Sequence, residues 1–219
     1  METRSHEHNF KLKEDTRQKY DRIARIYPLI NPIEETMMGV RKLRRNLLSK
    51  SSGKVLEIAV GTGVNFRYYN RDCDITAVDL SPALLEIARK KAAKLGLNVN
   101  FLVADAESLD FPDQSFDTVI SSMALCTFPE PITALREMAR VCRRGGRILL
   151  LEHGRSDREW LGRRQDRNVE KHAKRLNCVW NRNPFELVKD AGLKVIESHR
   201  YRLGMLHIIV ASPPDSRTI

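Results

Sequence analysis

Two patterns of polar and apolar residues alternate along most of this chain. Short unbroken apolar runs predict buried parallel strands near residues 55–60, 75–78, 98–104, 117–122 and 147–151. Helix start and stop signals predict helices between and after these runs, near residues 64–69, 82–95, 131–144 and 184–191. This alternation predicts an α/β fold with a doubly wound, mostly parallel sheet, which two last strands near 194–200 and 205–210 complete to seven.

Two segments stand outside the alternation. Residues 14–27 and 34–49 predict helices of an N-terminal cap that spans residues 1–50, ahead of a main domain at 51–219. His6 and His8 precede these helices, in what we expect to be a mobile tail. Residues 154–183 are rich in arginine and poor in apolar residues. A segment of that length after a strand predicts an active-site lid.

The strand near 55–60 leads into the turn Gly61-Thr62-Gly63. Glycine lets the backbone turn sharply and lets a ligand lie against it. The next strand ends on Asp79, and a carboxylate at that place can accept hydrogen bonds from both hydroxyls of a ribose. Strand, glycine turn, helix, strand and acid therefore predict a nucleoside site.

Phe66 indicates which nucleoside this is. A dinucleotide fingerprint needs a small residue three positions after the second glycine, so that helix and strand close around a pyrophosphate. This chain has phenylalanine there. A ligand with a ribose but without phosphates is therefore favoured, and a nicotinamide oxidoreductase remains an alternative that tight NADH binding would support.

These residues resemble the successive motifs of class I S-adenosylmethionine (SAM) methyltransferases. The motifs are Glu57-x-x-x-Gly61-x-Gly63, Asp79, residues 103–107 (VADAE) and residues 111–117 (FPDQSFD). The likeness is greatest to the UbiE-like branch, which includes quinone C-methyltransferases, phospholipid N-methyltransferases and thiol methyltransferases. It covers residues 19–153 and thins out across the lid. Many relatives have glycine where this chain has Ala59. The alanine methyl group narrows the room beside the methionine end of SAM.

The resemblance implies a set of residues that bind SAM, or its product S-adenosylhomocysteine (SAH). Asp105 would accept the exocyclic amine of adenine, although a carboxylate there also suits a turn cap. A Y-D-x-x-A-x-x-Y segment lies over the cofactor in the family. The implied cofactor residues are Tyr20, Tyr27, Glu57, Ala59, Gly61, Gly63, Asp79, Leu80, Asp105, Ala106, Ser121 and Ser122.

Composition narrows the class of protein. With 219 residues, 42% of them hydrophobic, the chain suits a globular protein with a sizeable core. Its four cysteines have no metal-binding spacing, so we expect no metal site and a reducing compartment. The N-terminus has no apolar signal core, and no run spans a bilayer. We expect a cytoplasmic protein, with peripheral membrane association as an open alternative.

The net charge of +10 is unevenly spread. Residues 1–54 hold 13 Lys/Arg against 7 Asp/Glu, residues 55–142 hold 8 against 12, and residues 143–202 hold 16 against 8. Basic segments on both sides of the predicted site suit an anionic acceptor or membrane surface, although a solvated basic surface explains them equally well. The composition disfavours nucleic acid as a partner, because aromatic residues, which stack on bases, make up only 6% of the chain and are not interleaved with the basic residues.

Methyl transfer from a sulfonium mainly needs a nucleophile held in line with the methyl group. A base matters only where the acceptor carries a proton near neutral pH. His153, directly after the fifth strand, is the candidate base, and Glu152 the residue that orients it. Glu152-His153 and Leu125-Cys126 resemble the thiol methyltransferase branch, although a packing role for His153 is equally open.

The sequence therefore predicts a SAM-dependent methyltransferase that acts on a small hydrophobic or amphiphilic acceptor. A thiol or other small nucleophile is favoured over a phospholipid amine and a quinone ring carbon. A non-catalytic SAM-binding or assembly protein is the alternative of another class.

Overall fold

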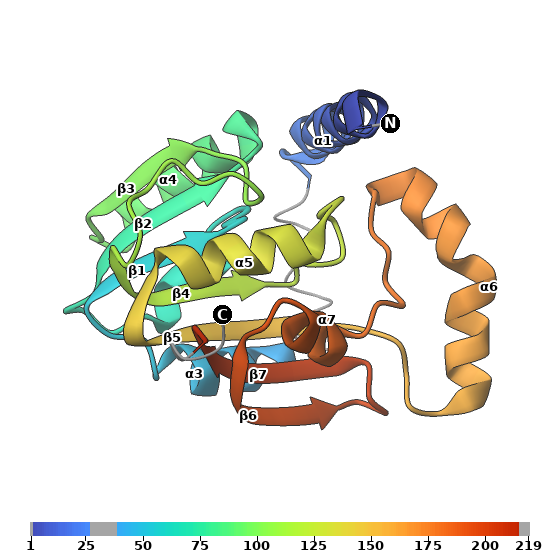
Figure 1. Ribbon diagram of the computed structural model, residues 1–219. Coiled ribbons are helices and arrows are strands. Elements are labelled where there is room, and N and C mark those ends of the chain that lie inside the picture. The colour runs from blue at the N-terminus through green and yellow to red at the C-terminus, as the bar shows by residue number, and fades with distance from the viewer. Residues whose placement is uncertain (1, 27–38, 215–219) are drawn as a thin grey trace.

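The computed structural model describes residues 2–26 and 39–214 (Figure 1). Its centre is a seven-stranded sheet of order β3-β2-β1-β4-β5-β7-β6. The first five strands are parallel, and β7 pairs antiparallel with both β5 and β6. The strands are β1 (Lys54–Ile58), β2 (Asp74–Asp79), β3 (Val99–Val103), β4 (Phe116–Ser122), β5 (Cys142–His153), β6 (Lys194–Tyr201) and β7 (Leu206–Ser212). The predicted fold is confirmed.

Helices cover both faces of the sheet. On one face, α3 (Val40–Leu48), α4 (Pro82–Lys94) and the 3-10 helix η1 (Val64–Tyr68) pack with one core cluster. On the other face, α5 (Pro131–Val141) and α7 (Pro184–Asp190) pack with a second cluster. Val55 belongs to the first cluster and Leu56 to the second. Because neighbouring residues of β1 enter opposite cores, this strand reads as an unbroken apolar run.

The predicted signals of α4 are confirmed. The Ser81 hydroxyl accepts a hydrogen bond from the Leu84 amide, Pro82 is the first helical residue, and Gly96 has φ +65°. The apolar spacing of this helix predicts that Leu84, Ala88 and Leu95 pack on the sheet. The prediction is wrong for Leu95, because α4 ends at Lys94 and leaves Leu95 at its C-cap, 38% exposed. Leu85 is buried in the core instead.

Several predicted boundaries are corrected by the structure. Helix α5 ends at Val141, and Gly145 and Gly146 lie inside β5 rather than at a helix end. A Cβ on Gly146 would lie 2.8 Å from the Asp117 carbonyl oxygen, so glycine serves close strand packing there. Helix α3 begins at Val40, after Gly39 at φ +68°. The predicted start of that helix, near residue 34, lies outside the described residues.

The N-terminal helix α1 (Glu2–Ile23) is longer than predicted. It includes the segment that we expected to be a mobile tail, with His6 and His8. The sequence signal for this part is charge rather than apolar period: Glu7 pairs with Lys11 at 2.8 Å, and Asp15 pairs with Lys19 at 2.7 Å, each one helical turn apart. The helix ends four residues before the predicted end at 27, and turn structure follows it.

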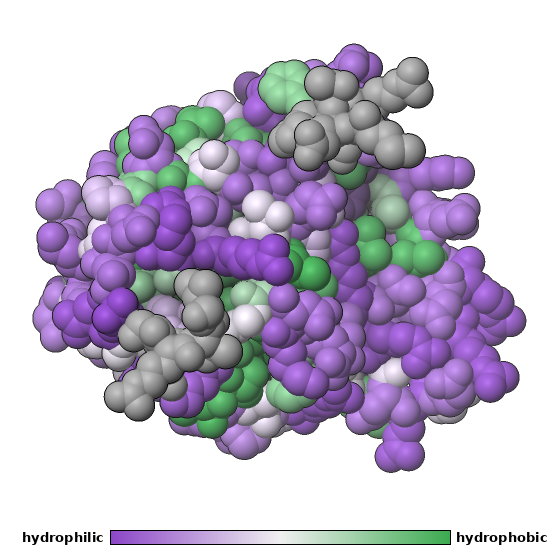
Figure 2. Space-filling model, in the orientation of Figure 1, coloured by the Kyte–Doolittle hydropathy of each residue, from purple (hydrophilic) through white to green (hydrophobic). Residues whose placement is uncertain are grey.

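The lid segment contains an 18-residue helix, α6 (Glu159–Leu176). In Figure 1, α6 and α1 lie on the side of the sheet where the parallel strands end. Figure 2 shows a mostly hydrophilic surface over α6. No helix among the described residues is long and apolar enough to cross a membrane.

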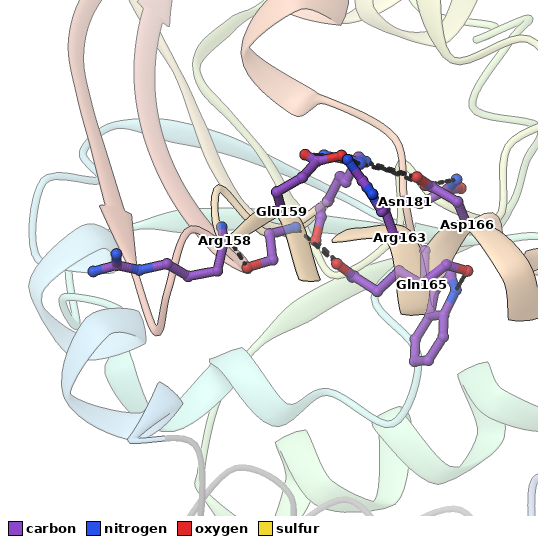
Figure 3. Close-up of polar contacts among 10 residues, drawn as sticks. Arg158, Glu159, Arg163, Gln165, Asp166 and Asn181 are labelled. Atoms are coloured by element: carbon purple, nitrogen blue, oxygen red, sulfur yellow. Dashed lines mark hydrogen bonds and ion pairs between the residues drawn. The ribbon is translucent and has the colours of Figure 1, made fainter. Parts of the chain in front are cut away.

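Polar contacts hold the start of α6 against the loop before it (Figure 3). The Gln165 side chain accepts a hydrogen bond from the Ser156 amide at 2.7 Å and donates one to the Gly154 carbonyl at 3.1 Å. Asp166 accepts hydrogen bonds from Arg155 at 3.0 Å and from Asn181 at 2.9 Å. The helix therefore has a defined position relative to the end of β5.

Candidate cofactor and acceptor site

The turn after β1 provides open space beside the backbone. Gly61 has φ +56°, and a Cβ added to it would meet no atom within 4 Å. Gly63 has φ +68°, but a Cβ there would lie 2.4 Å from the Phe66 ring. We expected both glycines to leave room for a ligand. The structure leaves open space only at Gly61 of the two, whereas Gly63 makes room for Phe66, which is buried.

The helix expected after this turn is only the 3-10 helix η1. Phe66 lies within it, in edge-to-face contact with Phe101 at a centroid distance of 5.9 Å. A large ring therefore fills the place where a dinucleotide fingerprint has a small residue. This packing supports the prediction of a ligand without a pyrophosphate.

Asp79 lies beside the Gly61 turn. Its Oδ2 accepts a hydrogen bond from the Gly61 amide at 2.8 Å, and its Oδ1 accepts one from the Ser81 amide at 2.9 Å. Burial raises the pKa of Asp79 to about 6, against these two hydrogen bonds, which lower it. Leu80 follows directly and is half-buried. The site thus combines an oriented carboxylate with open backbone.

Glu57 lies in a buried polar network at the end of β1. It accepts hydrogen bonds from Asn65 and from the Tyr69 hydroxyl, both at 2.7 Å, and Asn65 in turn accepts from Arg44. Burial raises the pKa of Glu57 to about 7. With both oxygens bound inside the protein, Glu57 supports the shape of the turn between β1 and η1.

Ala59 has a backbone conformation that suits glycine. Its φ is +51°, in the left-handed region that a Cβ disfavours. Glycine therefore suits this position because of its backbone conformation. The sequence resemblance had suggested another reason, the room beside the methionine end of SAM.

Asp105 lies after β3, where the adenine contact was predicted. Its Oδ2 accepts a hydrogen bond from Lys13 of α1 at 2.6 Å, and its Oδ1 accepts one from the Glu107 amide at 2.9 Å. Lys13 also pairs with Glu107 at 2.6 Å. Asp105 therefore caps its own turn and ties α1 to this end of the sheet. Ala106 is buried in the core beside it.

Helix α1 lies next to the Asp79 end of the sheet. The carboxylate of Asp21 accepts hydrogen bonds from the Ser81 hydroxyl and from the Ala83 amide at the start of α4. Tyr20 precedes Asp21 and is half-buried. The segment that the sequence predicts to cover the cofactor therefore lies beside the start of α4. Tyr27 lies outside the described residues.

The structure contradicts the predicted role of Glu152. Its Oε1 accepts a hydrogen bond from Ser121 at 2.8 Å, and its Oε2 accepts from the amides of Ala124 and Leu125 at 2.9 and 3.1 Å. Glu152 and His153 are consecutive in β5, so their side chains point to opposite faces. Glu152 therefore positions the loop after β4 and does not orient the imidazole. Ser122, next to Ser121, accepts a hydrogen bond from Arg44.

His153 contacts a cysteine instead. Its Nε2 lies 3.5 Å from Sγ of Cys178, and Cys126 completes a group whose ligand atoms all lie within 4.8 Å of one another. Burial alone would lower the pKa of His153, but its contact with Cys178 and the nearby Glu152 raise it. Sequence spacing did not reveal this group, because its members come from three distant segments: the loop after β4, the end of β5 and the segment after α6.

Comparison with known proteins identifies the domain. Residues 56–150 match the family model described as a methyltransferase domain. The chain is 31% identical over 216 residues to the mitochondrial methyltransferase OMS1 of Saccharomyces cerevisiae, a match that covers 90% of this chain and 46% of that protein. It is 40% identical over 108 residues to a phosphatidylethanolamine N-methyltransferase of Cereibacter sphaeroides, covering 48% of this chain and 53% of that one.

A further relative is the ubiquinone/menaquinone biosynthesis C-methyltransferase UbiE of Hahella chejuensis, 35% identical over 144 residues, with 61% of this chain and 57% of that one covered. The chain spans about half the length of these curated relatives. In fold it resembles a SAM-dependent methyltransferase of Aquifex aeolicus, with TM-score 0.61 at 19% identity over 85% of this chain and 96% of that one. Residues 56–150 therefore form a methyltransferase domain, and the sheet that they belong to has the topology of the class I SAM-dependent methyltransferase fold.

Proposed function

We propose that this protein transfers the methyl group of SAM to a small hydrophobic or amphiphilic acceptor, and that a thiol is the favoured acceptor. One observation supports the cofactor part above the others: the open space at Gly61 lies beside the oriented Asp79 carboxylate. Both lie at the C-terminal ends of adjacent parallel strands, where α/β sheets bind their ligands.

The residues around this space fit SAM in a simple way. The Asp79 carboxylate would accept the two ribose hydroxyls, and the bare backbone of Gly61 would lie against the nucleoside. Asp105 would accept the adenine amine, which requires that it share its Oδ2 with Lys13. Tyr20 would cover the cofactor from α1. Glu57 would act at one remove, through Asn65 and the shape of the turn.

The acceptor would lie over the ends of β4 and β5. The sheet order reverses between β1 and β4, so a cofactor over β1 and β2 has the ends of β4 and β5 as its neighbours. When bound, SAM supplies a methyl group already activated by the sulfonium charge. The protein has to hold the nucleophile about 3 to 3.5 Å from that group, opposite the sulfur. His153 lies on this side, where it would take the proton of a thiol.

A phospholipid amine is the second candidate acceptor. The relative named phosphatidylethanolamine N-methyltransferase is the observation in its favour, together with the basic segments that flank the site. A lipid acceptor would bring the protein to a membrane surface, and anionic lipid would then raise the activity. A quinone ring carbon, suggested by the relative named UbiE, stands third.

Two measurements test the proposal. Calorimetric titration with SAH should show binding to the wild-type protein and much weaker binding to Asp79→Ala. Asp74→Ala is the matched control, because Asp74 lies exposed at the other end of the same strand and should leave the affinity unchanged. Labelled SAM is then offered with small thiols, with phosphatidylethanolamine vesicles and with a quinone precursor.

Each outcome has a separate meaning. Transfer to thiols supports the favoured acceptor, and transfer to vesicles or to the quinone precursor replaces it by the second or third candidate. Binding of SAH without transfer to any acceptor would indicate a non-catalytic SAM-binding protein. Binding of NADH in preference to SAH would overturn the proposal as a whole.

A further inference from the structure

Two cysteines and a histidine from three distant segments converge beside the expected acceptor position. Cys126 follows β4, His153 ends β5 and Cys178 follows α6. Their ligand atoms lie within 4.8 Å of one another, and no other histidine, cysteine, aspartate or glutamate of the described ranges joins the group. Both cysteines are buried, 4% and 6% exposed, and both are free thiols.

The fold holds this group in place through the backbone. The Val179 amide donates a hydrogen bond to the Cys126 carbonyl at 2.8 Å, so the segment after α6 lies alongside the loop after β4. Arg182 strengthens this contact by donating hydrogen bonds to the carbonyls of Leu125 and Phe128. The Glu152 carboxylate holds the same loop from the other side, because it accepts hydrogen bonds from the amides of Ala124 and Leu125. Cys126 therefore lies in a loop that hydrogen bonds hold on both sides, next to His153 at the end of β5.

The spacing within the group suits zinc. Zinc binds cysteine sulfur at about 2.3 Å and histidine nitrogen at about 2.0 to 2.1 Å, usually with tetrahedral geometry. Two such ligands at a tetrahedral angle lie roughly 3.5 Å apart, by these bond lengths. The distance from His153 Nε2 to Cys178 Sγ is 3.5 Å. A hydrogen bond between the Cys178 thiol and the imidazole has the same length, so a metal titration separates the two arrangements.

We propose that Cys126, His153 and Cys178 bind one zinc ion and leave its fourth position open. Three protein ligands with an open fourth position are the pattern of catalytic rather than structural zinc. The donor set also selects the metal, because thiolate and imidazole ligands favour zinc over magnesium or calcium. The Cys126 and Cys178 sulfurs would bind as thiolates.

The open position gives the site a role in the proposed function, on which this part of the inference rests. An acceptor thiol that binds zinc through sulfur loses its proton to solvent. Its thiolate sulfur then forms a bond to the methyl carbon while the bond from that carbon to the sulfonium sulfur breaks. The products are a methyl thioether and SAH, with one proton released overall. His153 would in this case serve as a ligand, and the metal would replace it as the group that promotes deprotonation.

Metal binding is tested on the reduced full-length protein, apart from activity. Zinc is titrated in competition with a chromophoric chelator, and Co²⁺ is titrated alone as a spectroscopic probe. We expect one equivalent of metal and a thiolate-to-cobalt charge-transfer band in the wild type. Cys178→Ser and Cys126→Ser should lower the zinc affinity by at least about 100-fold, since loss of even an outer-shell partner costs 10- to 100-fold. Cys73→Ser and Cys142→Ser, which change cysteines outside the group, should leave it unchanged.

A second variant separates a ligand from a base. His153→Cys keeps a metal-binding donor but removes the imidazole, so we expect it to retain zinc and thiol methylation, whereas His153→Ala should lose both. Unchanged affinity for SAH shows that each variant is folded. Thiol methylation that persists without zinc would overturn the role of the metal in catalysis and would leave the proposed function intact. A wild-type protein that binds no zinc, or that forms a Cys126–Cys178 disulfide in place of binding it, would overturn the site itself.

Discussion

The Asp79 carboxylate accepts a hydrogen bond from the Gly61 amide at 2.8 Å. This contact joins the end of β2 to the turn after β1, the two features that the sequence singled out separately. A second hydrogen bond, from the Ser81 amide, holds the other oxygen of the same carboxylate. The acid is therefore oriented by backbone groups before any ligand binds, and little ordering cost would remain for the proposed contact with a ribose.

The first prediction concerns the pH dependence of SAH binding. Burial raises the pKa of Asp79 to about 6, so the carboxylate is charged above that pH and protonated below it. Ribose hydroxyls donate to the charged form, so we expect the affinity for SAH to be constant above about pH 7. It should fall by about tenfold per pH unit once Asp79 is mostly protonated. Calorimetric titrations between pH 5 and 8 measure this.

Asp79→Asn provides the control for that experiment. Its amide does not titrate, so its weak binding of SAH should be almost independent of pH over the same range. An equal fall of affinity in Asp79→Asn and in the wild type would show that some other group titrates.

The fold and the proximity of Gly61 to Asp79 were predictable from local sequence. The central parallel strands β1 and β4 are buried on both faces, and helix α4 carries its own start signal in Ser81 and Pro82. Gly61 and Asp79 were predictable because neighbouring parallel strands bring their C-terminal ends to one edge. These features depend on a few consecutive residues.

The remaining parts depend on tertiary contacts. Helix α6 was missed because it has no buried apolar stripe, and its contacts with the loop before it are polar, such as the hydrogen bond from the Ser156 amide to Gln165. The role of Glu152 was wrong because its partners, two amides after β4, are backbone groups of a distant segment. Cys178 lies close to Cys126 only because the chain after α6 returns to the loop after β4. The spacing of cysteines in the sequence does not predict such a contact.

The second prediction concerns Ala59. A left-handed conformation costs an alanine about 1 to 2 kcal/mol, whereas glycine adopts it freely but loses about 0.5 to 1 kcal/mol through the greater entropy of its unfolded chain. Ala59→Gly should therefore raise the free energy of unfolding by up to about 1.5 kcal/mol, the difference between these two effects. Urea denaturation measures the change. Ala93→Gly makes the same chemical change on the exposed face of α4 and should destabilise by about 1 kcal/mol. A loss of stability at both positions would contradict the argument.

The third prediction concerns Glu57, whose pKa burial raises from 4.5 to about 7. Asn65, Tyr69 and the Arg44 charge face it and lower the pKa, while Asp79 raises it. Between about pH 4.5 and 7 the folded protein keeps a proton that the unfolded chain has lost. The contribution of Glu57 to stability therefore falls as pH rises through this range, and is flat above it.

Glu57→Gln should remove this dependence, which amounts to about 3 kcal/mol at most by the size of the shift. Denaturation of the wild type and the variant at several pH values from 5 to 8 gives the two slopes. Glu86→Gln, on the exposed face of α4, should keep the slope of the wild type. If the wild type and Glu57→Gln had equal slopes, the buried carboxyl would not be the group that titrates.

The fourth prediction connects α1 with the site. Asp21 caps the start of α4 and lies near enough to Asp79 for its negative charge to raise the pKa of that residue. Asp21→Asn keeps the size of the side chain and removes the charge, so the pKa of Asp79 should fall and the onset of weak SAH binding should move to lower pH. Loss of the charged cap should also cost about 1 kcal/mol of stability and speed hydrogen exchange in α1.

Asp15→Asn, which removes a charge on α1 that pairs with Lys19, should leave the onset where it is. The midpoint of the pH profile reports the charge, and the affinity at high pH reports the docking of α1. A variant that weakened binding equally at every pH would therefore show that Asp21 acts only by holding the helix, and that its charge does not reach Asp79.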